Sequence, residues 1–299
     1  MTNISKEALQ KRTYYARVFY EVIKMDFYIN NIHNSTENPT QGDYPMHIHN
    51  DSHEIYCFLS GDAGYSVEGN HYHLEHGDLM LMRKGEVHHL MLKSNVRYER
   101  MVVNFDISSP SDLDPSGKLL AAFNERSLGK FNHYRASLFP DNQWLYYLNK
   151  ICSYDDPQQK LCYLLPLLND LADCFNTVKT SDSHSEKDRA ASVIKYINHH
   201  LRDDLSLDAL SAHFYLSKTH LNRIIKQSTG TTVWEYITVK RLFMARELIS
   251  AGESPTKVYP QCGFQDYTTF YRAYKQPFGV SPKGDHIKNK SASEKILVR

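Results

Sequence analysis

One pattern of residues occurs twice near the C-terminal end of the chain, within residues 205–283. The copies are offset by 49 residues, so Ser217 of the first corresponds to Asp266 of the second, and Arg223 corresponds to Arg272. Serine and aspartate at such positions accept backbone N–H groups of the following helical turn. Apolar residues then recur at helical spacing on one side, while basic and hydrogen-bonding residues occupy the other. Each copy is therefore predicted to be a helix, a tight turn and a second helix.

The residues between the copies predict a rigid connection. Thr232–Ser250 carries one apolar stripe at helical spacing. Its 19 residues would span about 28 Å as a helix. A rod of this length can hold two helices roughly one turn of DNA apart, about 34 Å. Because a short helix with a packed back and a basic front fits the major groove, the repeat favours DNA binding.

A longer signature surrounds the repeat. It consists of Leu216-Ser217, Gly230, Lys240-Arg241-Leu242 and the residues Cys262-Gly263-Phe264, Phe270, Arg272, Lys275 and Phe278-Gly279-Val280-Ser281-Pro282. The signature resembles the DNA-binding domain of the AraC/XylS transcription regulators over about Lys187–Lys288. The resemblance implies an all-α domain with two helix-turn-helix motifs that binds double-stranded promoter DNA, and that contacts RNA polymerase if the protein is an activator. Pro260 and Pro277 depart from the family pattern; because Pro260 lacks an N–H, the first helix of the second copy is expected to be short or kinked.

The second helix of each copy is expected to present its exposed face to DNA. Arg223 suits the O6 and N7 acceptors of guanine, and Asn222 suits the N6 and N7 atoms of adenine. The lysines are expected to contact phosphate, which sets affinity and not sequence preference. The alternative for the arginines is a surface ion pair, for instance with Asp266 or Glu235. The predicted DNA-facing residues are Lys218, Thr219, Asn222, Arg223, Lys226, Tyr267, Thr268, Tyr271, Arg272 and Lys275.

Charge is divided unevenly along the chain. Its 299 residues are enough for two domains and carry a formal net charge of only +1. From His184 onward there are 18 basic against 11 acidic residues, whereas residues 1–183 hold 17 against 23. A basic C-terminal part favours contact with a polyanion, although ordinary surface charge has a similar composition. The five cysteines have no metal-binding spacing, and no signal or membrane-length apolar run is found, so we expect buried thiols in a cytoplasmic protein.

The N-terminal part is predicted to be a small antiparallel β-barrel. Between about Asp43 and Ile107, short β-prone segments alternate with glycine-containing turns, and one more strand is expected at Asp26–His33. Gly69-Asn70 is predicted to be a two-residue hairpin turn. Many close-set strands of this kind are typical of a barrel. The other predicted strands are His53–Ser60, Gly64–Glu68, His71–Glu75, Asp78–Met82, Val87–Lys93 and Tyr98–Ile107.

A set of histidines lies within this predicted barrel. Side chains alternate along a strand, so His47 and His49 point the same way. With Glu54 and His88 they could form a site of three nitrogens and one carboxylate, suited to zinc, iron, nickel or manganese. The remaining barrel histidines are expected on the surface or on exposed strand faces: His53, His71, His73, His76 and His89.

The histidine motifs resemble the two signatures of the cupin superfamily. They read His47-x-His49-x4-Glu54-x6-Gly61 and Gly77-x5-Arg83-x-Gly85-x2-His88, with Arg83 and Leu92 in place of the usual proline and asparagine. Sensing domains of AraC type often keep such histidines as pocket walls. We therefore interpret His47, His49, Glu54 and His88 as residues that bind a small polar ligand, perhaps a sugar, without a metal. The alternative is a divalent metal held by the same four residues.

Helical spacing returns after the barrel. Asn142–Phe175 predicts two amphipathic helices, which resemble the dimerisation hairpin of AraC-type regulators and would alternatively pack on the barrel. Residues 1–25 could form a short helix or an arm. The polar segment Asn176–Asp188 is predicted to be a linker. The expected domains are therefore residues 1–175, the linker 176–188, and the DNA-binding domain 189–290.

The chain as a whole is predicted to be an α+β, two-domain regulator and not an enzyme. A cupin-like antiparallel β-barrel followed by two helices would sense a small-molecule effector, and an all-α double helix-turn-helix would read promoter DNA. Activation is commoner than repression in the family that the sequence resembles. Two alternatives stay open. One is a metal-dependent cupin enzyme with an attached DNA-binding domain, and the other is a constitutive DNA-binding protein with a purely structural barrel.

Overall fold

Two antiparallel sheets make up the N-terminal part of the protein. The computed structural model describes residues 27–40, 44, 46–49, 51–107, 114, 116–181 and 189–287, so the expected arm in residues 1–25 lies outside the described part. One sheet has the strand order β1-β7-β2-β5-β8 and the other has the order β4-β3-β6, which confirms the predicted antiparallel β fold. The strands are β1 (Phe27–Thr36), β2 (His53–Ser60), β3 (Ala63–Val67), β4 (Asn70–His73), β5 (Leu79–Met82), β6 (His88–Leu92), β7 (Tyr98–Ile107) and β8 (His133–Tyr134).

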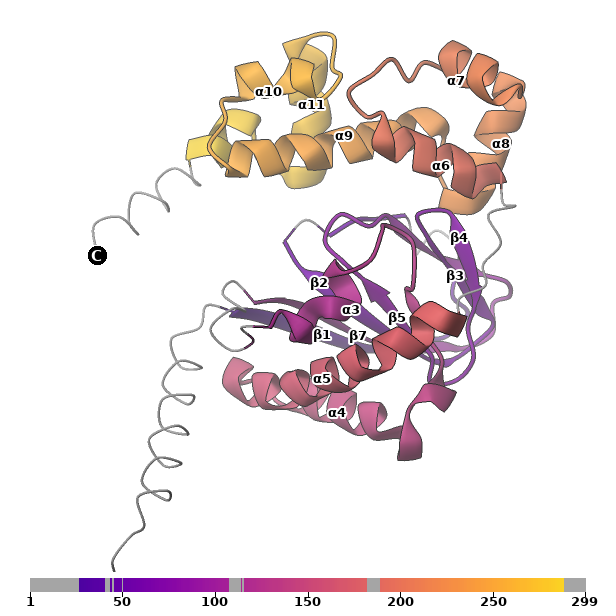
Figure 1. The fold of residues 1–299 in the computed structure, drawn as a ribbon, viewed down its shortest axis with the longest axis vertical. Coiled ribbons are helices and arrows are strands. Elements are labelled where there is room, and N and C mark those ends of the chain that lie inside the picture. Colours follow the sequence, from indigo (N-terminus) through magenta and orange to yellow (C-terminus); the bar gives the residue numbers. More distant parts are fainter. Residues whose placement is uncertain are drawn as a thin grey trace, which may run out of the picture.

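Alternation along the strands gives the five-stranded sheet two apolar faces. Ile55 of β2 and Val103 of β7 belong to the core on its outer face, whereas their neighbours Tyr56 and Val102 face the space between the sheets. The outer face is covered by α4 (Gln143–Ser153) and α5 (Pro157–Ser181), with η2 (Lys118–Leu120) and α3 (Ala121–Asn124) beside them (Figure 1). The predicted helical pair thus packs on the barrel, and its role in dimerisation stays a prediction.

Helix α5 is longer than the sequence indicated. It continues through Pro166 to Ser181, so the start of the predicted linker at Asn176 is wrong by six residues. Val178 explains the difference, because its side chain is only 3% exposed and anchors the last turns to the core. The cysteine prediction also needs a correction, since Cys162 on this helix is exposed. Within the described residues, no helix has both the length and the apolar character needed to cross a membrane.

The hairpin between β3 and β4 turns one residue earlier than predicted. Val67 pairs with Asn70, so the turn residues are Glu68 and Gly69 and not Gly69-Asn70. Both have positive φ, 48° and 80°, as a type I′ turn requires. Glycine adopts this conformation freely, but glutamate does so rarely, and such backbone conformations cluster at functional positions. The turn brings Glu68 to the tip of the hairpin, where it meets the C-terminal helices.

The C-terminal part consists of helices, and both predicted helix-turn-helix copies are present. Ser217 Oγ accepts a hydrogen bond from the backbone of His220 at 3.2 Å, and Asp266 accepts one from Thr269 at 2.8 Å. These contacts confirm the two predicted N-caps. The helices are α6 (Arg189–His199), α7 (Leu207–Phe214), α8 (Lys218–Thr229), α9 (Val233–Ser250), α10 (Pro255–Gln261) and α11 (Tyr267–Phe278), with a last helical turn over 282–287.

Helix α9 is the axis of this helical part. It starts with a capping box between Thr232 and Glu235, and its 18 residues span about 27 Å. Helices α6, α7 and α8 lie at one end of α9 and α10 and α11 at the other (Figure 1). Helix α10 is short, with seven residues against eight in α7, and it continues through Pro260 near its end. The prediction of a short helix is therefore supported, while a break at the proline is not observed.

A buried ion pair supports the turn that precedes β6. Glu86 and Arg126 are both fully buried, and Arg126 Nη1 and Nη2 donate to the two carboxylate oxygens at 2.6 and 2.8 Å. The amide of Asn132 and the backbone N–H of Gly129 donate to the same carboxylate. The loop after α3 is thereby tied to the strand that carries His88.

We expect Arg126→Met to cost about 3–5 kcal/mol of the barrel's stability, because it leaves the Glu86 carboxylate buried without its counter-charge. The matched control is Lys118→Met, which removes an ion pair with Asp173 whose side chains are 58% and 56% exposed, and which should cost at most about 1 kcal/mol. Urea unfolding followed by circular dichroism measures both. Equal midpoints for the two variants would contradict the role given to the buried pair.

Candidate functional site

Helix α8 presents part of its predicted DNA-facing set to solvent. Lys218, Thr219, Arg223 and Lys226 are exposed, and Arg223 Nη1 donates to Gln227 of the same helix, at 3.3 Å. Asn222 is half-buried instead, and its side-chain oxygen accepts a hydrogen bond from Val233 N at 3.1 Å. This bond occupies the oxygen that a bidentate contact with adenine requires. Asn222 therefore satisfies the first free N–H of α9, and this role favours packing over the predicted contact with a base.

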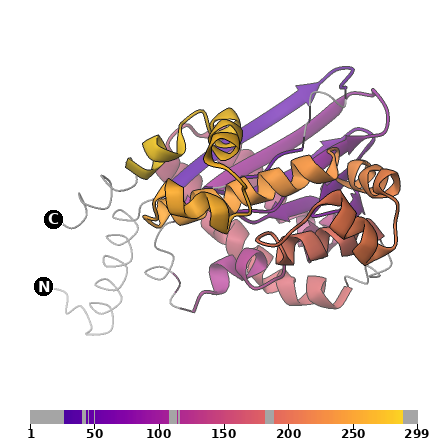
Figure 2. The same ribbon diagram turned by 90° about the horizontal axis from the view of Figure 1, so that it is seen from above.

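Helix α11 presents the corresponding face of the second copy. Thr268, Tyr271, Arg272 and Lys275 are exposed there. Tyr267 is half-buried, and its ring packs edge-on against Tyr259 at a centroid distance of 5.7 Å. It therefore contributes more to packing than its place in the repeat indicated. In both views, α8 and α11 lie at opposite ends of α9 (Figure 1, Figure 2). The exposed Arg223 and Arg272 therefore lie on two helices that α9 holds apart.

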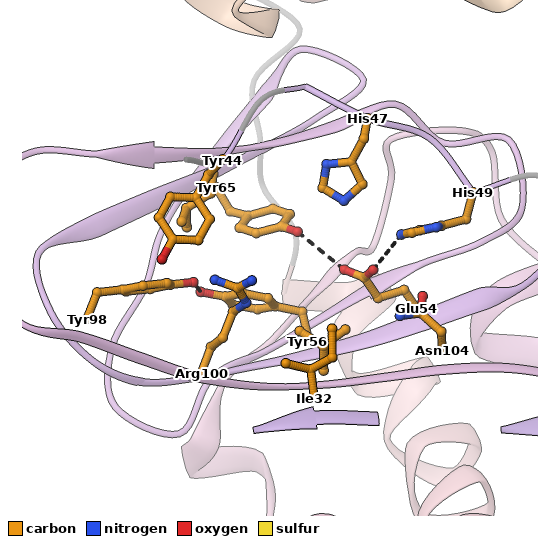
Figure 3. Close-up of a pocket in the computed structure, with 12 residues that line it drawn as sticks. Ile32, Tyr44, His47, His49, Glu54, Tyr56, Tyr65, Tyr98, Arg100 and Asn104 are labelled. Atoms are coloured by element: carbon orange, nitrogen blue, oxygen red, sulfur yellow. Dashed lines mark hydrogen bonds and ion pairs between the residues drawn. The ribbon is translucent and has the colours of Figure 1, made fainter. Parts of the chain in front are cut away.

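The four residues predicted to form a site in the barrel do come together. One ligand atom from each of His47, His49, Glu54 and His88 lies within 4.8 Å of the others. His49 Nε2 lies 2.7 Å from Glu54 Oε2, and the Nε2 atoms of His47 and His88 lie 2.9 Å apart. Figure 3 shows His47, His49 and Glu54 on one side of a cavity of about 180 Å³.

Backbone pairing holds two of these histidines in register. His47 and His88 form an antiparallel bridge, with N–H to O distances of 3.1 and 3.0 Å. His88 Nδ1 lies 2.9 Å from the carbonyl oxygen of Glu86, to which it can donate, and this leaves Nε2 as an acceptor toward His47 Nε2. Burial, followed by the nearby His47 ring, lowers the pKa of His88 to about 3 and keeps its imidazole neutral.

The donor set fits a divalent transition-metal ion. Burial opposes ionisation of Glu54, but the adjacent His88 and His49 rings hold its pKa well below its usual range, so the carboxylate is charged. Neutral imidazoles and a carboxylate are the ligands that zinc, nickel and iron take, at about 2.0–2.2 Å. A bound ion would supply a positive charge that orients oxygen atoms of a ligand. The convergence of these side chains thus gives the metal-binding alternative a geometric basis, which the spacing of the residues in the sequence alone did not give.

We expect Ni²⁺ added to chelator-treated protein to raise the melting temperature by several degrees, since binding to the folded state at 100 times Kd stabilises it by about 2.7 kcal/mol. His49→Gln should abolish the shift. His33→Gln, at an exposed histidine paired with Glu99, should retain it. If the unaltered protein shows no shift with Ni²⁺, Zn²⁺ or Mn²⁺, the four residues act only as a hydrogen-bonding wall.

Two other barrel histidines are not on the surface, contrary to the prediction. His53 is 6% exposed and packs against the rings of Phe105 and Phe123. His89 is 8% exposed, and a Cβ added to Gly230 would come within 3.0 Å of its Nε2. Strand position alone did not reveal either, because His53 faces the helical layer and His89 faces the C-terminal domain.

The barrel and the helical domain share a buried polar contact that the sequence did not reveal. The Glu68 carboxylate is 3% exposed and accepts from Lys240 Nζ at 2.9 Å, Tyr236 Oη at 2.6 Å and Asn198 Nδ2 at 2.7 Å. It also accepts from the backbone N–H of Val87 at 2.8 Å. The sequence signal was a lysine within the apolar stripe of α9, since a lysine that is 4% exposed needs a partner.

Around this contact the two parts pack closely. Ser66 Oγ donates to the carbonyl oxygen of Ser228 at 2.6 Å, and Ser228 Oγ donates to the carbonyl oxygen of Gly69 at 2.9 Å. A Cβ added to Gly69 would lie 2.3 Å from Ile194 Cδ1, so the hairpin tip fits against α6 without room for a side chain. The C-terminal end of the reading helix α8 is therefore seated on the barrel.

Comparison with known proteins matches both parts of the chain. The AraC-like ligand binding domain matches residues 35–109, which include the cluster of His47, His49, Glu54 and His88, and the Helix-turn-helix domain matches residues 210–284, which include α8 and α11. A barrel with a cavity joined to a helical domain with two exposed reading helices defines a DNA-binding transcription regulator with a ligand-binding domain. The chain belongs to the AraC/XylS family of such regulators.

Individual relatives are distant. The HTH-type transcriptional activator RhaS of Escherichia fergusonii is 26% identical over 252 residues, covering 81% of this chain and 87% of that protein. The C-terminal domain of AraT, a response regulator from Geobacillus stearothermophilus, is 28% identical with a TM-score of 0.31, covering 32% of this chain and 82% of that chain. ToxT from Vibrio cholerae O395 is 12% identical with a TM-score of 0.37, covering 88% of this chain and 97% of that chain.

We expect Arg223→Ala to cost about 1–3 kcal/mol of specific DNA binding and to relax the preference at one base pair. Lys226→Ala should weaken binding to all sequences alike and reduce the slope of log K against log salt by about one. Binding isotherms at several salt concentrations, with fragments selected from a random DNA pool, separate the two effects. Unchanged specificity in Arg223→Ala would show that this arginine does not read a base.

Proposed function

We propose that the protein activates transcription in response to a small polar molecule bound in the barrel cavity. Activation is supported by the name of a relative, the transcriptional activator RhaS, which matches most of both chains. Residues up to Ser181 would form the sensing part and residues 189–290 the DNA-binding part. One structural observation carries the proposal, namely that the same two backbone segments form a wall of the cavity and a wall of the domain contact.

The alternation of side chains produces this double use. His47 and His49 face the cavity. Met46, which precedes His47, and Ile48, which lies between the two histidines, pack into the core of the helical domain. In the paired segment, Leu90 lines the cavity and His88 joins the cluster of His47, His49 and Glu54, whereas Val87 packs into the same helical core. A ligand that moves the histidines therefore also moves apolar side chains that hold the helical domain.

The Glu68 contact adds a second connection between the histidine cluster and the helical domain. Its carboxylate accepts from the N–H of Val87, next to His88, and also from Lys240 and Tyr236 of α9. Lys240 Nζ donates in addition to the carbonyl oxygen of Gly85, in the same turn. A ligand shifts the equilibrium between two arrangements of the domains only by its difference in affinity for them. These contacts provide such a difference, because displacing the turn before His88 disturbs a buried ion pair.

The test begins with a thermal-shift screen of sugars and small metabolites on the full chain. We expect at least one compound to raise the melting temperature and to change DNA affinity by about 5-fold or more, within the usual range of allosteric coupling. Conversion of that compound into a product would favour the enzyme alternative. If no compound shifts the melting temperature, the barrel is structural and DNA binding is constitutive.

The coupling route is tested in the same assay with Lys240→Met. The variant should still show the ligand-dependent rise in melting temperature, because the cavity residues are intact, but its change in DNA affinity should fall toward one. Lys257→Met, at an exposed lysine of α10, is the matched control and should behave like the unaltered protein. A full ligand response in Lys240→Met would rule out the Glu68 contact as the route.

A further inference from the structure

The barrel cavity extends beyond the histidine cluster to an arginine on β7. Arg100, Val102 and Asn104 line it together, because alternate residues of a strand share one face. Asn104 lies four positions after Arg100, so their Cα atoms lie about 13 Å apart along the strand. In Figure 3, Arg100 lies among tyrosines on the side of the cavity opposite His49. The cavity therefore has two chemically different ends.

The Arg100 end offers hydrogen-bond donors and a positive charge. The guanidinium carbon lies 4.8 and 5.5 Å from the ring centroids of Tyr44 and Tyr98. Its Nη1 is shielded from solvent and has no hydrogen-bond partner among the described residues. The hydroxyls of Tyr56 and Tyr98 lie 2.6 Å apart, so one donates to the other and the second keeps its own hydrogen to donate elsewhere.

The charge at this end is not neutralised by the cavity itself. Glu54 is the only carboxylate among the described lining residues, and it is bound by His49 at the other end. The tyrosine faces attract the guanidinium. Burial opposes its charge, whereas hydrogen bonds with the Tyr98 and Tyr44 hydroxyls help to raise the pKa of Arg100, but these groups are neutral and leave Nη1 without a partner among the described residues. A carboxylate with two acceptor oxygens is the group that matches a planar guanidinium, and a neutral hydroxyl supplies no charge.

The opposite end offers mainly acceptors. Asn104 Oδ1 is shielded and has no partner among the described residues. Glu54 Oε1 receives only a long hydrogen bond from Tyr65, at 3.4 Å, besides its contact with the histidines. Hydroxyl groups donate to such acceptors, and the aromatic walls between the two ends suit the C–H faces of a sugar ring.

We propose that the effector is a small hydroxy carboxylic acid of the sugar-acid class, with its carboxylate on Arg100 and its hydroxyl groups toward Asn104 and the histidine cluster. This inference rests on the proposed function and deepens it by naming the chemical class of the effector. It differs from the neutral sugar expected from the sequence by a single feature, the charge that Arg100 requires.

Matched pairs of compounds test the charge requirement. D-glucuronate against D-glucose, D-galacturonate against D-galactose, and D-gluconate against D-glucitol are titrated into the full chain by calorimetry and thermal shift. We expect at least one acid to bind at least 10-fold more tightly than its neutral partner. Binding of neutral partners as tight as that of the acids would overturn the proposal, and so would the absence of binding by every acid.

Two variants locate the charge. Arg100→Met should weaken binding of the acid at least 10-fold and leave binding of the neutral partner unaffected. Arg97→Met changes a side chain that is 58% exposed just before the same strand, and this variant should bind the acid normally. DNA binding by Arg100→Met shows that the variant folds, and Arg100→Lys, which keeps the charge without the planar fork, should recover part of the affinity. Undiminished acid binding in Arg100→Met overturns the proposal.

The proposed function fails separately from this inference. A protein that binds no selected DNA refutes the regulator itself. If the protein binds DNA and responds to an uncharged compound in the screen, the proposed regulatory function stands and the proposal of an acidic effector fails.

Discussion

The arrangement of the two domains depends on one buried ion pair, between Glu68 and Lys240. Each residue is almost fully excluded from solvent, and each belongs to a different domain. Taking the two charges out of water costs several kcal/mol per ion, so their contact is worthwhile only when the remaining donors and acceptors are satisfied. Here Tyr236, Asn198 and a backbone carbonyl satisfy them. Such a pair contributes specificity of docking more than net stability, because partial separation of the domains would leave a charge without its partner.

The effect of that pair reaches the cavity through short connections. The hairpin that carries Glu68 is strained at the turn, and Glu68 itself binds the backbone next to His88. In the proposed mechanism, movement of the histidines would act on this contact, which joins the barrel to α6 and α9. The ion pair of Glu86 and Arg126 ties the same turn to the loop after α3.

The sequence predicted the elements well and their contacts poorly. Both helix caps, the strands β2 and β7, and the convergence of His47, His49, Glu54 and His88 followed from local chemistry and from the periods of helix and strand. The turn at Glu68 was misplaced because glutamate seldom adopts positive φ, and only a tertiary partner makes that conformation worthwhile. The place of Asn222 in the repeat did not show that its side chain accepts from the first N–H of the next helix.

The cavity residues beyond the histidine motifs were out of reach for a different reason. Arg100 follows no motif, and an arginine in an alternating strand usually faces solvent. Its partial burial depends on the rings of Tyr44 and Tyr98, which lie beside the guanidinium. Pairing of strands that are far apart in the sequence determines these contacts, and a single sequence carries little information about it.

The period of two along residues 46–49 and 86–89 has a consequence for how such a protein can change during evolution. Cavity side chains and docking side chains occupy alternate positions on the same segments, so each can be replaced without moving the other. Substitution can therefore change what the cavity accepts while the domains stay joined. Loss or gain of one residue in either segment would turn the cavity side chains toward the helical domain and the docking side chains toward the cavity. The cavity and docking positions of these segments should therefore tolerate variation in residue type, whereas the segments should tolerate almost no change in length.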